Sequence, residues 1–598
     1  MTARKKKNTT QMSFDFDQDS APAQKKDSKK TTKSVKKKNA KKATKKSPKN
    51  KDVKPAVKST TPAPKKKRSR KAVAATAESM AAKQRDISVS EFFAKNRHLL
   101  GFDNPRKALL TTVKEAVDNS LDACEEAHIL PDLKIIIQPI ENTDNKFVLT
   151  VQDNGPGIMA KQVPNIFARL LYGSKFHTLK MSRGQQGIGI SAAGMYGLLT
   201  TGEPVQIITR TSGKKPARHY HVQIDTTKNR PEVISDEECE FEWSKGTSVT
   251  ITLEGKYLKG KQSVDEYISQ TAMANPHTTI IYHAPGGEVH EYPRQNKELP
   301  FIPIEIKPHP YGVELGVLFK MARESSSKTM AEFLRSEFSR VSPRLGGEIA
   351  KKAKLSARLR PTRITLKETE RLHDAINSTK IMSPPTDCIG PIGEEKMIEG
   401  LSRVVEADFY SSCTRKPSVY RGNPFVVEAA LAYGCKDIKK HKDDDKEPLM
   451  RLVRFANRVP LLYQQSGCAT HKAVLDTNWR NYGLSQSRGA LPCGPMMLMV
   501  HIASVWVPFT SESKEAVAHY PEIIKELKLA IQECGRKLGI HVRKQRRIKD
   551  ELIKRGYIEI YLPHIGQALK EILVLKEPQV KKVVNNLTHI LEKTRSMP

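Results

Sequence analysis

The chain has 598 residues, a formal net charge of +37 at pH 7 and eight cysteines. This length predicts several domains, since a single hydrophobic core stops growing well before it. No apolar run approaches the 18 residues that a membrane-spanning helix needs, so we expect no membrane segment. The cysteines are scattered singly, with no CxxC pair and no signal sequence. They favour reduced thiols in the cytoplasm or nucleoid, or in the nucleus of a eukaryote, over a disulfide framework.

Residues 1–82 form a basic, low-complexity tail. Residues 1–71 alone hold 26 Lys or Arg and five Asp. Few large apolar side chains are present to offset chain entropy, so we expect disorder. The tail can tether DNA by counterion release or serve as a solubilising arm, and residues 65–71 also fit a nuclear-import patch. Residues 11–16 look like a short docking peptide for a sliding clamp.

Order is expected from about residue 86. Ser88 and Glu91 form a capping-box pattern ahead of a short amphipathic helix, and Asn104 with Pro105 starts a longer one. Alternating apolar residues predict strands at 134–138, 147–152, 205–210, 248–253 and 279–282. Helices with an intervening, mixed sheet make this first domain an α/β sandwich.

The second half changes pattern twice. From about 325 to 385 it is helical and basic, with three short helices predicted at 329–338, 347–357 and 366–376. Strands then return, the clearest at 452–463 and 496–507. Pro521 opens a helix to about residue 538, and residues 543–591 are again helical and charged.

The helix that follows Asn104 has two unlike faces. Glu115, Asn119 and Asp122 fall in one narrow arc at about 100° per residue. The opposite face is apolar and suited to docking on a sheet, through Leu109, Val113, Val117 and Leu121. A carboxylate and a carboxamide one turn apart suit a general base beside a metal ligand. Taken alone, the pattern favours an ordinary surface helix that carries its polar residues outward.

Two glycine motifs downstream decide in favour of a site. Asp153 ends a predicted strand, where its carboxylate can accept a hydrogen bond from an adenine amino group, and Gly155 and Gly157 let the backbone pass close to the base. A second loop enters a helix near Ile190, with backbone N–H groups that can cradle phosphates. Its sequence is Arg183-Gly184-Gln185-Gln186-Gly187-Ile188-Gly189-Ile190. Asn119 can ligate Mg²⁺, and Glu115 can polarise the attacking water. The P-loop pattern GxxxxGK[ST] is absent.

This order of motifs within about 75 residues resembles the GHKL ATPase superfamily, with its Bergerat α/β sandwich. Thr247, in Lys245-Gly246-Thr247, resembles the last pocket motif of that superfamily. The resemblance implies ATP and Mg²⁺ as cofactors. A sensor kinase would need a phosphoacceptor histidine helix upstream, where this chain has its lysine-rich tail.

Longer strings narrow the resemblance. Residues 90–105, 172–177, 390–394, 455–463 and 507–516 are similar to the B subunits of DNA topoisomerase VI, a type IIB topoisomerase. That resemblance implies a multidomain α+β protein. Its parts are a disordered tail (1–82), a strap exchanged between protomers (83–104), a GHKL ATPase domain (105–320), a helix-two-turns-helix module (321–385), an α/β transducer (386–538) and a C-terminal helical segment (539–598).

The resemblance also implies particular roles. Lys514 would be a switch lysine that reaches from the transducer to the γ-phosphate, and Ser174 and Lys175 would lie in the ATP lid. Two copies would dimerise on binding ATP and capture a DNA duplex. A separate A subunit in an A₂B₂ assembly would cut the DNA, docked on residues 539–598. The net result would be relaxation of supercoils and decatenation.

Nothing in this sequence supplies strand cleavage itself. Asp443, Asp444 and Asp445 form the one DxD-like run, and we interpret it as a solvated loop. None of the 16 tyrosines has a recognisable catalytic setting. Cys468 and His471 are only a metal half-site, of a kind that arises by coincidence. Two other functions stay open: a DNA-tethered scaffold that binds nucleotide as a regulatory ligand, and a chaperone-like GHKL ATPase that acts on protein.

Overall fold

The computed structural model describes residues 77–82, 84, 86–176, 178–184, 186–438 and 448–594. The chain divides into two units, residues 1–84 and 85–598. In the first, a short helix α1 spans Ala77–Ala81, within the segment that we expected to be disordered. The predicted clamp peptide at residues 11–16 and the aspartates at 443–445 lie outside the described residues.

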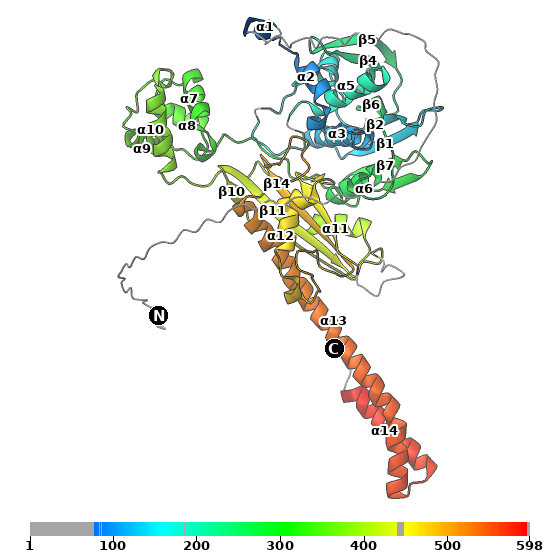
Figure 1. Cartoon of the computed structure of the whole chain (residues 1–598). Coiled ribbons are helices and arrows are strands. Elements are labelled where there is room, and N and C mark those ends of the chain that lie inside the picture. The colour runs from blue at the N-terminus through cyan, green and yellow to red at the C-terminus, as the bar shows by residue number, and fades with distance from the viewer. Residues whose placement is uncertain are drawn as a thin grey trace, which may run out of the picture. The chain divides into compact units, whose positions relative to one another are not determined.

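An eight-stranded sheet with helices packed on it forms the first domain of the second unit (Figure 1). The strand order is β5-β4-β3-β6-β2-β1-β7-β8, and only the β1–β7 pairing is parallel. The strands are β1 (Asp132–Pro139), β2 (Lys146–Asp153), β3 (Val205–Arg210), β4 (Ala217–Asp225), β5 (Arg230–Cys239), β6 (Gly246–Glu254), β7 (Thr279–His283) and β8 (Val289–Tyr292). The helices are α2 (Val89–Lys95), α3 (Pro105–Glu126), α4 (Val163–Ala168), α5 (Gly189–Thr201) and α6 (Val264–Ala274). The predicted α/β sandwich is confirmed, although β4, β5 and β8 were not predicted.

A helical cluster with its own hydrophobic core follows (Figure 1). Its helices are α7 (Leu315–Glu324), α8 (Met330–Glu337), α9 (Pro343–Lys352) and α10 (Leu366–Asn377). Three of the four match the helices predicted from sequence, and α7 was missed. Phe333, Leu334, Ile349 and Leu372 are fully buried between the helices, so the cluster is held together by its own apolar side chains.

The second sheet has the order β10-β11-β14-β12-β13, with β9 also paired to β11. The strands are β9 (Phe409–Thr414), β10 (Ser418–Tyr420), β11 (Asn423–Tyr433), β12 (Arg451–Ala456), β13 (Val459–Pro460) and β14 (Met496–Ser504), and the flanking helices are α11 (Glu394–Val404) and α12 (Ala469–Leu475). The prediction of one strand over 452–463 is wrong. Asn457 and Arg458 have φ angles of 48° and 67°, and this left-handed pair turns β12 back into the short β13.

The C-terminal helices differ from prediction in length. The helix that opens at Pro521 does not end near residue 538, because α13 continues to Leu573 as one element of 53 residues. Helix α14 (Glu577–Thr594) then folds back along it (Figure 1), where Gly566 lets Val580 and Val584 approach closely. The limits of the domains assigned from sequence stay predictions.

Candidate functional site

Helix α3 holds the two side chains that the sequence pointed to first. The Asn104 side chain caps its N-terminus by accepting a hydrogen bond from the Lys107 N–H, and Pro105 occupies its first turn. The apolar face is fully buried, as predicted, through Leu109, Val113, Val117 and Leu121. Packing on this face fixes the opposite one, where Glu115 and Asn119 line a cavity.

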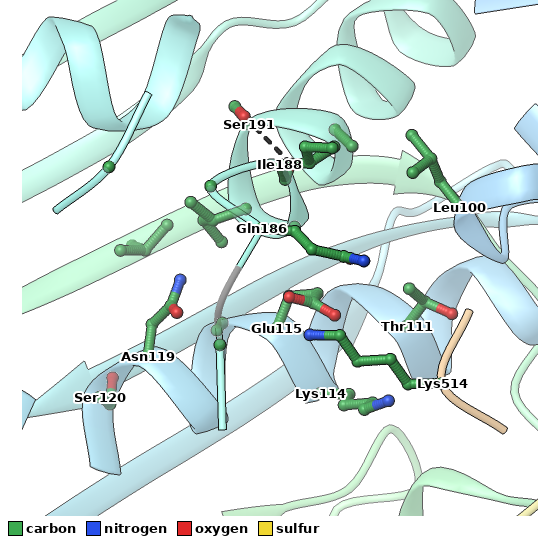
Figure 2. A pocket seen from close by; sticks show the side chains of 18 of the residues that line it. Leu100, Thr111, Lys114, Glu115, Asn119, Ser120, Gln186, Ile188, Ser191 and Lys514 are labelled. Carbon is green, nitrogen blue, oxygen red and sulfur yellow. Dashed lines mark hydrogen bonds between the residues drawn. The ribbon is translucent and has the colours of Figure 1, made fainter. Parts of the chain in front are cut away.

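That cavity measures about 690 Å³ and is walled by segments far apart in the chain (Figure 2). One wall is α3, a second is the loop after β2, and a third is the glycine-rich loop that leads into α5. Residues 512–515, which precede α13 in the chain, close the remaining side. Its volume falls in the range of small-molecule sites, roughly 300–1,000 Å³.

Asp153 lies at the floor, at the end of β2. Ser120 Oγ donates to its Oδ2 at 2.8 Å and the Gly155 N–H donates to its Oδ1 at 3.0 Å. Burial raises the pKa of this carboxyl to about 6, although these donors and the Thr247 backbone act against the rise. A held carboxylate at the floor of a cavity can accept from one amino group of a ligand. Thr247 also lines the cavity, opposite Asp153 in the β2–β6 register.

The glycine-rich loop passes directly over Glu115. A Cβ on Gly189 would lie 1.7 Å from Glu115 Oε2, so only glycine fits there. Gly187 has a φ of +56° and would drive a Cβ into the Phe176 ring at 2.5 Å. The loop enters the 13-residue helix α5 at Gly189, near the predicted start, and backbone N–H groups at such a start attract anions. The loop residues that line the cavity are Gly184, Gln186, Gly187, Ile188, Gly189 and Ile190.

The predicted lid residues Ser174 and Lys175 also line the cavity. Lys175 Nζ pairs with Asp122 at 2.7 Å and with Glu126 at 3.4 Å. Burial alone would lower the pKa of Lys175, but Asp122 and Glu126 hold it above its ordinary value. A permanently charged ammonium therefore stands at the rim.

Two predicted residues are placed differently. The Arg183 side chain is not part of the cavity wall, because its guanidinium is buried against Asp122 and Glu125 at 2.9 and 2.7 Å. Gly155 supports Asp153 through its N–H instead of lining the cavity, whereas Gly157 does line it. Gln185 lies outside the described residues.

Lys514 reaches the same cavity from the other domain (Figure 2). Its ammonium lies beside the Glu115 carboxylate and donates to the Arg183 carbonyl at 3.5 Å. Burial lowers the pKa of Lys514, while Glu115 acts in the opposite direction. Its backbone φ of 53° is left-handed, a strained conformation that is kept where surrounding structure demands it.

Some functional neighbours were missed from the sequence. Gln186 of the glycine-rich loop donates to Glu512 of the Lys514 loop, and Lys107 on α3 pairs with Glu515 at 2.6 Å. Asp118, behind Glu115, accepts from the Tyr267 hydroxyl at 3.0 Å, and burial raises the pKa of its carboxyl to about 7. Ser120, which donates to Asp153, could have been found from the sequence, because it directly follows the predicted site residue Asn119. The other pairs join distant segments and carry no local signal.

Two further features of the described residues concern metal ligands and membrane helices. No group of three or more His, Cys, Asp or Glu side chains there is arranged to hold a metal ion. Cys468 is buried and contacts the Thr470 hydroxyl at 3.0 Å. In the same part of the chain, no helix combines the length and apolarity needed to cross a bilayer.

Comparison with known proteins places both halves of this cavity. Residues 104–256 match the family of histidine kinase-, DNA gyrase B- and HSP90-like ATPases, and residues 384–554 match the transducer of the topoisomerase VI B subunit. The chain is 48% identical over 509 residues to the B subunit of type 2 DNA topoisomerase 6 from Methanococcoides burtonii, covering 85% of this chain and 80% of that protein. The chain belongs to the family of topoisomerase VI B subunits.

Other members of the family are also similar to this chain over most of its length. The Methanosarcina acetivorans protein of that name is 46% identical, over 85% of this chain and 80% of its own length. The Archaeoglobus fulgidus protein is 43% identical, over 86% and 84%. This topoisomerase VI B subunit thus carries a GHKL-type ATPase domain, which implies ATP binding, and a transducer domain. The cavity lies where residues from the two domains meet.

Proposed function

We propose that this B subunit is the ATP-operated gate of a type IIB topoisomerase. Two copies dimerise on binding ATP, capture a DNA duplex and transmit closure to a separate A subunit that cuts a second duplex. Strand passage then relaxes supercoils and decatenates DNA. One observation carries the proposal: Glu115 of the ATPase domain and Lys514 of the transducer line a single cavity. A ligand held there contacts both domains at once.

In this proposal each wall of the cavity has a task. Asp153 accepts from the adenine amino group, and the N–H groups of the loop from Gly184 to Ile190 bind phosphate oxygens. Ser174, Lys175 and Thr247 complete the enclosure. Glu115 polarises the water that attacks the γ-phosphorus, and the adjoining Lys514 ammonium orients the carboxylate and stabilises phosphate charge.

The site also fits a magnesium ion. The Asn119 side chain is exposed to the cavity, and its Oδ1 would meet a Cβ on Gly184 at 3.4 Å, so glycine leaves room around it. A single hard oxygen together with ligand phosphates is a usual setting for Mg²⁺. The ion would neutralise charge on the triphosphate, and Asn119 would hold it.

The C-terminal helices supply a surface for the A subunit. Along α13, apolar side chains stay largely exposed, with Ile560 at 64% and Leu573 at 60%. Further exposed members are Leu552, Ile553, Tyr557, Tyr561, Ile565 and Ile572. Exposed apolar side chains in such number mark a protein contact, which supports residues 539–598 as the docking segment of an A₂B₂ assembly.

The basic tail and the strap complete the proposal. The tail, residues 1–82, tethers duplex DNA by its charge, which suits a cytoplasmic, nucleoid-bound enzyme, or a nuclear one in a eukaryote. Ser88 caps the N-terminus of helix α2 in the strap, and its hydroxyl donates to the Thr226 carbonyl at 2.6 Å. Phe92 on that helix is 40% exposed, so it is available to a second protomer when the strap is exchanged.

The test is a relaxation assay with the full chain and a tyrosine-bearing A subunit. ATP-dependent relaxation is expected with the unaltered chain. In Lys514→Ala, relaxation should fall more than ATP turnover does, because coupling between the two domains fails before ATP hydrolysis does. Nucleotide binding with no relaxation would favour the scaffold, and ATP-dependent refolding of a client protein would favour a chaperone; either result would refute the gate. Omitting residues 1–82 should flatten the salt dependence of DNA binding.

A further inference from the structure

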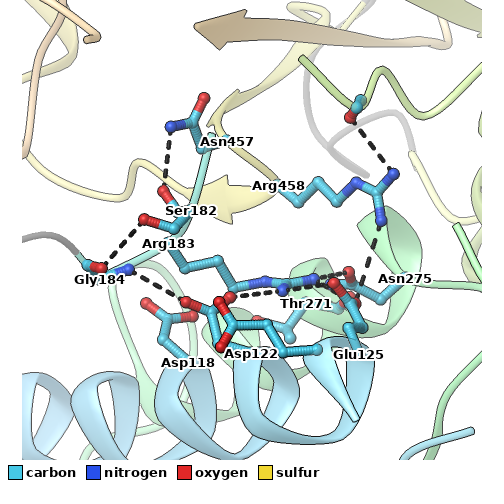
Figure 3. A network of polar contacts seen from close by, with 12 residues as sticks. Asp118, Asp122, Glu125, Ser182, Arg183, Gly184, Thr271, Asn275, Asn457 and Arg458 are labelled. Atoms are coloured by element: carbon cyan, nitrogen blue, oxygen red, sulfur yellow. Dashed lines mark hydrogen bonds and ion pairs between the residues drawn. The ribbon is translucent and has the colours of Figure 1, made fainter. Parts of the chain in front are cut away.

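A buried polar network joins α3 to the transducer beneath the nucleotide cavity (Figure 3). At its centre is Arg183, which directly precedes the glycine-rich loop and has a side chain only 4% exposed. Its guanidinium donates to Asp122 Oδ1 at 2.9 Å, to Glu125 Oε1 at 2.7 Å and to Asn275 Oδ1 at 2.7 Å. The entry to the loop is therefore fixed to α3 by charged hydrogen bonds away from water, where such bonds are strongest.

Glu125 connects this network to further groups. Its Oε1 contacts His277 Nε2 at 2.9 Å and the Arg458 Nη1 at 4.0 Å. Burial would raise the pKa of this carboxyl, but Arg183, His277 and Arg458 hold it well below its ordinary value. Glu125 is thus a permanent anion shared between an arginine of the ATPase domain and an arginine of the transducer.

The transducer also holds the backbone of the loop entry. Asn457 Nδ2 donates to the Ser182 carbonyl at 3.1 Å, and Lys514 Nζ donates to the Arg183 carbonyl at 3.5 Å. Two successive carbonyls before Gly184 are bound by two separate transducer segments. Figure 3 shows the Asn457 and Arg458 side chains directed toward the loop entry and the network.

The turn that presents these side chains is conformationally costly. Arg458 has a φ of 67°, a region that glycine adopts freely and a long side chain does not. Its N–H donates to His501 Nε2 at 3.0 Å, and its guanidinium donates to the Gly390 and Pro391 carbonyls at 3.3 and 3.1 Å. A two-residue hairpin turn alone would favour Asn-Gly, so arginine at this position serves something other than the turn.

We propose that the Asn457–Arg458 turn is a second positioning device of the transducer, one that fixes the entry of the glycine-rich loop independently of Lys514. This inference rests on the proposed function, since it assumes that the loop binds nucleotide. Lys514 reaches the ligand cavity, whereas the turn acts through Ser182 and Glu125 on the backbone that carries the loop. Coupling between two sites is reciprocal. A nucleotide that orders the loop therefore also orders the turn.

The decisive variant is Arg458→Gly, because it relieves the left-handed backbone while removing the guanidinium. A merely structural role predicts lower thermal stability, and the positioning role predicts unchanged or higher stability with a coupling defect. Arg421→Gly is the matched control. Arg421 also has a positive φ, of 46°, in a transducer turn, but its side chain is exposed and stacks on Tyr420 and Tyr520.

Hydrogen exchange of the full chain, with and without a non-hydrolysable ATP analogue, gives the readout. In the unaltered chain the analogue should protect both residues 184–190 and residues 451–463. In Arg458→Gly, protection of 451–463 should disappear, and the analogue concentration that half-saturates dimerisation should rise about fivefold or more. Arg421→Gly should match the unaltered chain in both measurements.

A second variant guards against a misleading fold defect. Asn457→Gly keeps the left-handed backbone and removes the donor to the Ser182 carbonyl, together with two hydrogen bonds of that side chain to the Ser504 backbone. It should show the same loss of protection at 451–463, and denaturant unfolding measures how much the loss of the Ser504 contacts adds. Protection of 451–463 in both variants at the unaltered analogue affinity would overturn the inference. If the analogue protects neither segment of the unaltered chain, nucleotide binding itself is refuted and the proposed function fails with it.

Discussion

The cavity that Glu115 and Lys514 line has two sides of different construction. On the ATPase side, α3 is a 22-residue helix whose apolar face is fully buried through Leu109, Val113, Val117 and Leu121. On the transducer side, the wall is the loop at 512–515, which attaches to the ATPase domain by polar contacts from Glu512, Lys514 and Glu515.

The difference separates a fixed part from a movable one. Each buried apolar side chain of α3 contributes roughly 1.5–3 kcal/mol to folding, so Glu115 and Asn119 cannot move without unfolding the domain. The three polar contacts of the transducer loop involve charged groups and contribute about 1.5–3 kcal/mol each. Water can replace such contacts when the loop leaves, whereas nothing replaces a buried apolar contact, so the loop can leave and return. A gate needs this asymmetry, because chemistry requires fixed geometry whereas coupling requires two arrangements.

The largest effect is expected on the fixed side, from Glu115→Ala. Removing the group that polarises water should lower the rate constant of hydrolysis by about 10²–10⁴-fold. ATP-driven dimerisation should persist, because the phosphate and adenine contacts remain. Steady-state turnover and size-exclusion chromatography measure the two. Glu238→Ala, on the exposed strand β5, is the control, and near-normal turnover of Glu115→Ala would contradict the assignment.

Asn119→Ala should weaken nucleotide binding about 10-fold or more, since even the loss of a group behind a metal ligand costs about 10- to 100-fold in metal affinity. Calorimetric titration of ATP with and without Mg²⁺ tests whether loss of the metal ligand causes the weaker binding. Chelation should weaken binding to the unaltered chain and change little in the variant. Equal Mg²⁺ dependence in both proteins would remove Asn119 from the metal site.

A smaller effect is expected on folding stability, from Asp118, which lies behind Glu115 on the fixed side. The pKa of Asp118 is about 7 in the folded chain, above the unfolded value of about 3.9. The folded state therefore binds the proton more tightly, and stability should fall as pH rises from about 4 to 7. Asp118→Asn should raise stability on the order of 1–2 kcal/mol at pH 8 and less at pH 5. Denaturant unfolding at both pH values measures the difference. An equal gain in stability at both pH values would contradict the assignment of the effect to the Asp118 proton.

The smallest predicted effect is at the cavity floor. The Asp153 carboxyl, with a pKa of about 6, should be ionised at pH 7.5 and protonated at pH 5.5. Protonation weakens its acceptance of the adenine amino group, so ATP affinity should fall about three- to fivefold over this range, as for one weakened hydrogen bond. Asp153→Asn should bind ATP more weakly than the unaltered chain at pH 7.5, and its ATP affinity should change less with pH. A variant as pH-dependent as the unaltered chain would place the titrating group elsewhere.

The fixed side was also the predictable one. Glu115, Asn119 and Asp153 follow from the helical period and from a carboxylate at a strand end, because these signals are local. The transducer side was harder to predict from the sequence. Asn457 and Arg458 were included in one long strand, since the apolar residues on both sides continue and Asn-Arg carries no turn signal of the Asn-Gly kind.

Arg183 and α13 show two further limits of local pattern. Arg183 adjoins Gly184 and was assigned to the nucleotide, yet its partners Asp122, Glu125 and Asn275 are brought to it only by the tertiary fold. Helix α13 continues past residue 538 with many charged residues and exposed apolar ones. That surface lacks the one-sided pattern by which a helix that packs on a core is recognised.

The most direct test of the central claim is the preference of the full chain for ATP over ADP, with and without Lys514. If Lys514 crosses from the transducer to the γ-phosphate, the unaltered chain should bind a non-hydrolysable ATP analogue about tenfold or more tighter than ADP, as for a charged hydrogen bond to phosphate. Lys514→Ala should lose most of that preference while its ADP affinity stays unchanged. An undiminished preference in Lys514→Ala would contradict the account.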